Sequence, residues 1–156
     1  MKSVIKTLLR KTPYRVVRSR GVNRFSVIEE ALESLRSRGF SPHRIVDGGA
    51  NTGVFSRFAL GVFPEAFIHA IEPQPGCAGV LQTLRSKALG RLEVHQFALC
   101  DPEQDGSMLE LAADLSSTST GAHVVLRAQQ PASSIVVPCI SLDKLLANVS
   151  TPQDCA

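Results

Sequence analysis

Residues 45–53 read Ile45-Val46-Asp47-Gly48-Gly49-Ala50-Asn51-Thr52-Gly53, and Glu72-Pro73 follows nineteen residues after the last of these glycines. This pattern is typical of a buried strand, a glycine turn and a helix start, followed by a second strand that ends in a carboxylate. Glycines suit such a turn because the backbone must approach a ligand closely. The stretch therefore predicts a site for the adenosine part of a cofactor, with Glu72 accepting hydrogen bonds from the ribose hydroxyls.

The segments around this stretch alternate between strand and helix patterns. Apolar runs of strand length are separated by amphipathic segments of helix length, which predicts an α/β fold with a parallel sheet and helices on both faces. Ser26 and Glu29 form a capping-box pair before the first of these helices, and Gly39 suits its carboxyl end. The expected strands are 44–48, 67–71 and 92–99, and the expected helices start at residue 26 and cover 54–62 and 75–87.

The pattern changes after residue 100. A short strand is expected at 108–111, a polar loop at 116–120, a β-branched strand at 134–140 and a short helix at 142–147. We therefore divide the chain into a basic leader (1–24), one cofactor-binding domain (25–147) and an irregular tail (148–156).

Charge is distributed unevenly along the chain. Eight basic residues and no acidic residue precede Glu29, although the formal net charge of the whole chain is only +3. A basic leader can contact nucleic acid or anionic lipid, but no aromatic side chains alternate with these charges as stacking on bases would require. A solvated arm, or a helix packed on the domain, is the simpler interpretation, and no nucleic-acid partner is expected.

No apolar run approaches the roughly 20 residues that cross a bilayer, and the start of the chain has no signal-peptide pattern. A cytoplasmic protein without stable membrane insertion is therefore expected. The four cysteines and four histidines are scattered, with no C-x-x-C spacing. This spacing predicts free thiols and no metal site.

Three interpretations of the glycine turn compete. A phosphate-binding P-loop needs a lysine after the last glycine, and a dinucleotide turn needs G-x-G-x-x-G, and neither is present. The pattern acid-x-G-x-G-x-G fits if Asn51 replaces the middle glycine, because Asn tolerates left-handed backbone geometry. The acid, Asp47, suits S-adenosylmethionine, which carries an ammonium and a sulfonium and no phosphate. The competing structural interpretation is that Asp47 caps the turn and that Glu72 is a solvated acid before a proline.

The motif Asp47-Gly48-Gly49-Ala50-Asn51-Thr52-Gly53, followed by Ala70-Ile71-Glu72-Pro73-Gln74-Pro75, resembles the FkbM family of S-adenosylmethionine-dependent methyltransferases. Weaker likenesses continue through residues 97–101, 106–111 and 137–143. The resemblance implies a Rossmann-like class I methyltransferase fold and methyl transfer to a hydroxyl on a sugar or natural product. Gly48 departs from the aliphatic residue usual in the family, which is expected to loosen the strand end slightly. The implied cofactor-binding residues are Asp47, Gly49, Ala50, Asn51, Gly53, Glu72 and, more weakly, Ala98.

In the family, further strands and helices follow the segment that resembles residues 137–143, and the next strand lies beside the strand at 44–48. Nothing in 148–156 has that pattern, so we expect a shortened copy whose strand 44–48 is an open sheet edge, able to self-associate. No catalytic base is evident, since His69 and His95 fall within expected strands. The alternatives are a non-catalytic binding module that keeps the fold and, less favoured, a nicotinamide-dependent oxidoreductase.

Overall fold

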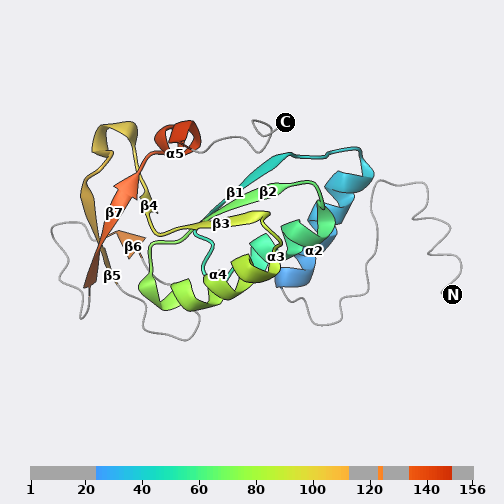
Figure 1. Ribbon diagram of the computed structural model, residues 1–156, viewed down its shortest axis with the longest axis horizontal. Coiled ribbons are helices and arrows are strands. Elements are labelled where there is room, and N and C mark those ends of the chain that lie inside the picture. Colours follow the sequence, from blue (N-terminus) through green and yellow to red (C-terminus); the bar gives the residue numbers. More distant parts are fainter. Residues whose placement is uncertain (1–23, 113–122, 125–133, 149–156) are drawn as a thin grey trace, which may run out of the picture.

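The computed structural model describes residues 24–112, 123–124 and 134–148 (Figure 1). Its first sheet consists of three parallel strands in the order β1-β2-β3. This order is that of the first half of a Rossmann-like sheet, so the expected α/β fold class is confirmed. Among the described residues β1 pairs with β2 alone. The strands are β1 (Arg44–Gly48), β2 (Phe67–Ile71) and β3 (Leu92–His95).

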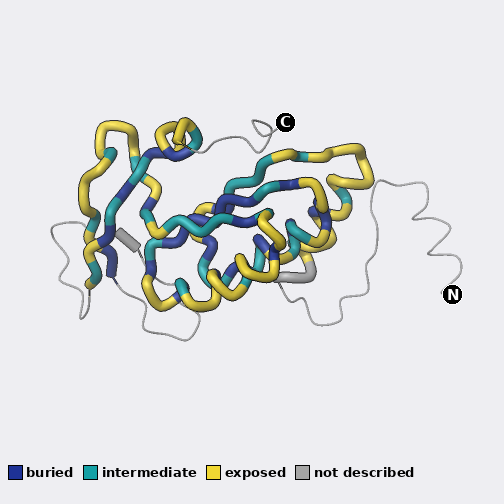
Figure 2. Tube along the Cα trace, in the orientation of Figure 1, coloured by how far each residue is buried: buried dark blue, intermediate teal, exposed yellow. Residues whose placement is uncertain are grey.

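Three helices cover one face of this sheet: α2 (Arg24–Ser37), α3 (Val54–Val62) and α4 (Pro75–Lys87) (Figure 1). The strand residues that face them, such as Ile68 and Ala70, join the helices in one hydrophobic core. Figure 2 shows β2 buried along most of its length, as a strand in the middle of a sheet should be. Within the described residues these helices lie on the same face of the sheet. The other buried residues of this core are Leu32, Ala50, Ala59, Val62, Phe63, Ala66, Cys77, Leu81, Ala88 and Leu92.

Helix α2 begins at Arg24, so Ser26 lies inside its first turn and the expected capping box with Glu29 is wrong. The end of the helix agrees with expectation. Gly39 has φ 88°, and the backbone N–H of Phe40 donates to the Leu35 carbonyl at 3.1 Å. A left-handed glycine after the last turn is the usual way to end a helix.

The expected strand 92–99 is two strands, which corrects the sequence interpretation. β3 ends at His95, and β4 (Ala98–Leu99) pairs in parallel with β7 (Ser134–Ile140) in a second sheet. That sheet has the order β4-β7-β5-β6 and also contains β5 (Met108–Ala112) and β6 (His123–Val124). Residues 92–99 are continuous in sequence, but the first part pairs with β2 in the first sheet and the last two residues pair with β7 in the second. A 3-10 turn (Pro102–Gln104) and helix α5 (Leu142–Asn148) complete the described elements.

The expected leader, polar loop and tail fall wholly or almost wholly outside the described residues. None of the helices in the described ranges has both the length and the apolar character that a bilayer crossing requires. Among the described residues, Cys77, Cys100 and Cys139 form no disulfide bond.

Candidate functional site

The glycine turn connects β1 to α3 and uses left-handed backbone geometry three times. Gly49, Asn51 and Gly53 have φ values of 78°, 51° and 72°. The expected left-handed conformation of Asn51 is therefore confirmed. Its side chain accepts a hydrogen bond from the Thr52 N–H at 2.7 Å, which is how Asn favours such a turn.

The backbone N–H groups of residues 49–53 all donate within the protein. Those of Gly49 and Ala50 both reach the carbonyl of Ile71 at 2.9 Å. The Gly53 N–H reaches the Ala50 carbonyl at 2.7 Å. A phosphate cradle requires such N–H groups to point at the ligand. This turn instead pins the end of β1 to the end of β2.

Gly53 is required by packing as well as by its backbone angle. A Cβ atom at this position would lie 2.7 Å from Leu84 Cδ2 and 3.0 Å from Leu81 Cδ2. The turn therefore packs directly onto α4, and a larger residue would force these leucine side chains to move. Gly48 has a related role, because a Cβ there would lie 3.0 Å from Leu99 Cδ1.

Glu72, directly after β2, is buried and turned toward the glycine turn. Its Oε2 accepts the Asn51 N–H at 2.8 Å, and its Oε1 accepts the Gln74 N–H at 2.9 Å. Only 4% of Glu72 is exposed, so the interpretation as a solvated acid is wrong. An ionised carboxylate has about four acceptor positions, which leaves capacity for further donors such as hydroxyls.

Asp47, the last buried residue of β1, contacts the first turn of α3. Its Oδ2 accepts a hydrogen bond from the Ser56 hydroxyl at 2.6 Å. Burial raises the pKa of the Asp47 carboxyl above its usual value, and the nearby Glu72 charge adds to the rise, whereas hydrogen bonds from the Ser56 side chain and backbone oppose it. The capping interpretation of Asp47 is thus supported. Capping does not exclude a second role, because the same carboxylate carries the negative charge that a cofactor site would use.

The structure brings most of the expected site residues together and separates one. Ala50 is buried in the main core beside the turn. Ala98 lies in β4, and its side chain packs in the second sheet with Leu111, Val137 and Cys139. The predicted adenine contact of Ala98 remains a prediction. The residues that meet at the turn are Asp47, Gly49, Ala50, Asn51, Gly53 and Glu72.

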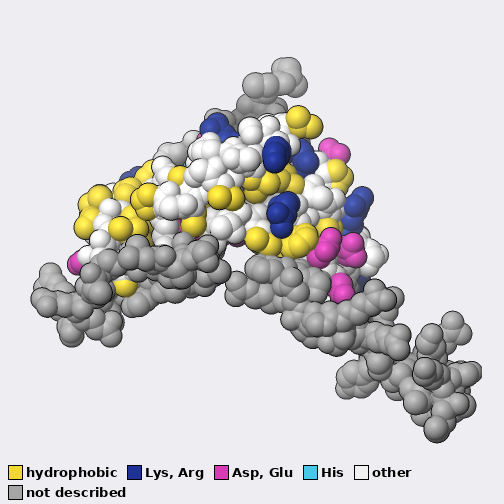
Figure 3. Space-filling model, turned by 90° about the horizontal axis from the view of Figure 1, so that it is seen from below, with side chains coloured by type: hydrophobic (Ala, Val, Ile, Leu, Met, Phe, Trp, Pro, Cys, Tyr) yellow, Lys and Arg dark blue, Asp and Glu magenta, His cyan; other side chains and the backbone are white. Residues whose placement is uncertain are grey.

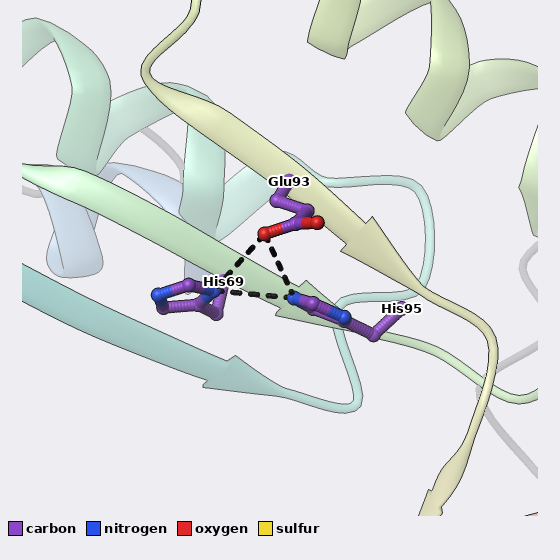
Figure 4. A group of neighbouring side chains, drawn as sticks. All are labelled: His69, Glu93 and His95. Carbon is purple, nitrogen blue, oxygen red and sulfur yellow. Dashed lines mark hydrogen bonds and ion pairs between the residues drawn. The ribbon is translucent and has the colours of Figure 1, made fainter. Parts of the chain in front are cut away.

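A second polar cluster was missed by sequence reasoning. His69 on β2 and His95 on β3 approach within 3.1 Å, and Glu93 lies beside both (Figure 4). Burial lowers the pKa of each imidazole below its usual value; His95 and Arg44 lower that of His69 further, while Glu93 opposes the shift in both. Spacing along the chain could not reveal the pair, because the two residues come from different strands.

Figure 3 shows the molecule from the helix side. Several Lys and Arg side chains lie on this face, and most of the visible Asp and Glu side chains lie toward one end.

Comparisons with known proteins reveal only distant likeness. No protein-family model matches the chain, and no curated protein matches it significantly. The chain is similar to a proposed RNA methyltransferase from Pyrococcus horikoshii, with a TM-score of 0.40 and 22% identity over 60% of this chain and 50% of that one. It is also similar to a precorrin-6y C5,15-methyltransferase from Geobacter metallireducens, with a TM-score of 0.37 and 18% identity over 53% and 43% of the two chains.

The chain thus spans about half the length of these two structures or less. At such TM-scores the likeness carries no argument about activity. The resemblance to the FkbM family rests on the residues quoted above and remains a prediction.

Proposed function

We propose that this chain binds S-adenosylmethionine at the glycine turn and belongs to a methyltransferase of the FkbM type that methylates a hydroxyl on a sugar or natural product. The observation that carries the proposal is the pair of buried carboxylates, Asp47 and Glu72, on either side of a turn whose own N–H groups donate within the protein.

Charge separates this proposal from phosphate binding. Two acids beside the turn repel a pyrophosphate and favour a cationic ligand. S-adenosylmethionine carries an ammonium and a sulfonium, which suits this potential. Because the N–H groups of residues 49–53 donate to Ile71, Glu72, Asn51 and Ala50, the turn also lacks the donors that a P-loop presents.

The proposed roles follow from position. Glu72, at the carboxyl end of β2, has acceptor capacity for the two ribose hydroxyls. Asp47, at the carboxyl end of β1, serves the methionine end through its negative charge. Gly49 has no atom near the position of an added Cβ, so that the backbone there can lie against the ligand.

Methyl transfer itself is a direct displacement. When bound, S-adenosylmethionine would supply a methyl group that the acceptor oxygen takes directly, with S-adenosylhomocysteine as the leaving group and the hydroxyl proton passing to a base. Because the sulfonium is already a good leaving group, the protein mainly contributes proximity and orientation. We assign the binding of the methyl donor to the glycine turn. We assign the role of the base to none of the described residues.

The test is isothermal titration calorimetry with S-adenosylhomocysteine, with NADH as the competing ligand. We expect S-adenosylhomocysteine to bind and Asp47→Asn to weaken that binding, while the protein stays folded by circular dichroism. Glu65→Gln is the matched control, because Glu65 is an exposed acid just before the start of β2, at the opposite end from Glu72. Absence of binding to well-folded protein, or selective binding of NADH, would contradict the proposal.

One observation favours a second candidate, a non-catalytic interaction module. Within the described residues β1 has one strand neighbour, and an open edge of a parallel sheet can pair with another chain. This candidate predicts concentration-dependent self-association in sedimentation experiments, without any binding of S-adenosylhomocysteine.

A further inference from the structure

Three donor atoms from β2 and β3 converge on one point (Figure 4). His69 Nδ1 and His95 Nε2 are 3.1 Å apart, and Glu93 Oε2 lies 3.9 Å and 3.7 Å from them. The carboxylate is too far from either ring for a hydrogen bond. The three groups therefore face one another at close range, but only the two imidazoles form a hydrogen bond with each other.

These separations are those expected around a shared metal ion. The point equidistant from the three atoms lies about 2.1 Å from each, which matches the roughly 2.0–2.2 Å of zinc bonds to imidazole nitrogen and carboxylate oxygen. Two imidazoles and one carboxylate are also a ligand set that divalent zinc and ferrous iron use in proteins. The geometry therefore needs no rearrangement of the strands to receive an ion.

The sheet itself sets this arrangement. His69 is opposite Glu93 in the parallel register, and Ile71 is opposite His95. Residues two apart on a strand share a face, so all three ligands project from the same side of the sheet. That side is opposite the one on which Ile68 and Ala70 pack against the helices. The site is thus separate from the helix-side core and is held by two hydrogen-bonded strands.

Burial favours an ion over bare side chains. His69 is fully buried, and its Nδ1 faces the Nε2 of His95. A buried polar pair of this kind is costly unless something organises it. The Glu93 side chain is 43% exposed, which leaves a path for an ion and for a fourth ligand from solvent.

We propose that His69, Glu93 and His95 bind one divalent transition-metal ion, with Zn²⁺ as the ion whose distances fit best. The ion links β2 to β3 and keeps one coordination position open. His69 binds through Nδ1 and His95 through Nε2, so each ring carries its proton on the other nitrogen. This site goes beyond the methyl-donor site and does not depend on it.

The test uses the whole chain, without a histidine tag, stripped of metal by a chelator. Zn²⁺ is titrated in competition with a chromophoric chelator, and Co²⁺ is added to a second sample to record its visible spectrum. We expect one ion per chain, a higher melting temperature with Zn²⁺ and the intense absorption of four- or five-coordinate Co²⁺. Wild-type protein that binds less than stoichiometric Zn²⁺ at micromolar concentrations would overturn the proposal, whatever the variants do.

Two ligand variants locate the ion. Glu93→Gln and His95→Asn should each lower Zn²⁺ affinity at least about 10-fold, since even groups that only orient metal ligands have effects of that size. His43→Asn is the matched control, because His43 is an exposed histidine outside the cluster, and it should bind as the wild type does. Unchanged affinity in both ligand variants, or loss of the ion in Cys100→Ser instead, would place the metal elsewhere and overturn the proposal.

Discussion

The Oε2 atom of Glu72 accepts a hydrogen bond from the backbone N–H of Asn51 at 2.8 Å. This contact joins the end of β2 to the left-handed residue of the glycine turn. The carboxylate that we assign to the cofactor ribose therefore also holds the turn in shape before any ligand arrives. A Glu72 variant can therefore lose ligand binding because the ribose contact is gone or because the turn is distorted. Measurements of stability separate these two causes.

Replacing Glu72 with Ala should destabilise the fold. The substitution leaves the N–H groups of Asn51 and Gln74 without their acceptors, at about 1–3 kcal/mol for each buried group. We expect a clear drop in the free energy of unfolding in urea, whereas Glu65→Gln should change it little because Glu65 is exposed. A Glu72→Ala protein as stable as the wild type would show that these hydrogen bonds contribute nothing to stability.

Asp47→Asn should stabilise the fold at neutral pH while weakening the binding of S-adenosylhomocysteine. Burial raises the folded-state pKa of Asp47 above 3.8, so the unionised form is the one that the fold favours. The stability contributed by this carboxyl is present below pH 3.8 and is lost as the pH rises through the folded-state pKa. The Asp47→Asn protein does not lose this stability as the pH rises, because Asn does not ionise.

Urea unfolding at several pH values checks this prediction. The advantage of Asp47→Asn over the wild type should grow as the pH rises from below 3.8 to neutrality and then level off. Glu65→Gln should show no comparable trend. An advantage that shrinks with rising pH would contradict the assigned direction of the pKa shift.

Gly53→Ala should cost stability through two effects. The residue has φ 72°, which costs an L-residue about 1–2 kcal/mol. The added Cβ would also overlap Leu84 Cδ2 at 2.7 Å, and overpacking typically costs about 1–3 kcal/mol. We expect a loss of at least about 2 kcal/mol by chemical denaturation.

Gly79→Ala is the matched control for this change. Gly79 lies within α4, is exposed, and has no atom near the position of an added Cβ. Alanine there should stabilise the protein by about 0.5–1 kcal/mol, because it favours the helix. Equal effects of the two substitutions would show that the turn is not held in the described conformation.

Gly48→Val tests the contact between β1 and β4. The added side chain would meet Leu99 Cδ1, so we expect a loss of about 1–3 kcal/mol. Leu99→Ala should relieve part of this loss, giving a coupling energy of about 0.5–3 kcal/mol in a double-mutant cycle. Strictly additive effects would mean that Gly48 does not accommodate Leu99.

The sequence predicted the elements of the first sheet closely. The strands at 44–48 and 67–71 and the helices at 54–62 and 75–87 have the expected bounds. These elements have strong local signals, namely apolar runs, a glycine turn and a proline at a helix start. The sequence interpretation was wrong at residues 92–99, which contribute strands to two sheets, and at Ser26, where the helix begins earlier.

The sequence alone determined the glycine turn, the left-handed position of Asn51 and the carboxylates at the carboxyl ends of the first two strands, because these depend on residue type and short spacing. Only the tertiary structure decided what those groups contact: Asp47 meets Ser56, and Glu72 meets the Asn51 N–H. It alone also placed His69 against His95. The two histidines are 26 residues apart in the chain, and their contact depends on the register between β2 and β3. That register is set by packing across the sheet and leaves no local pattern in the sequence.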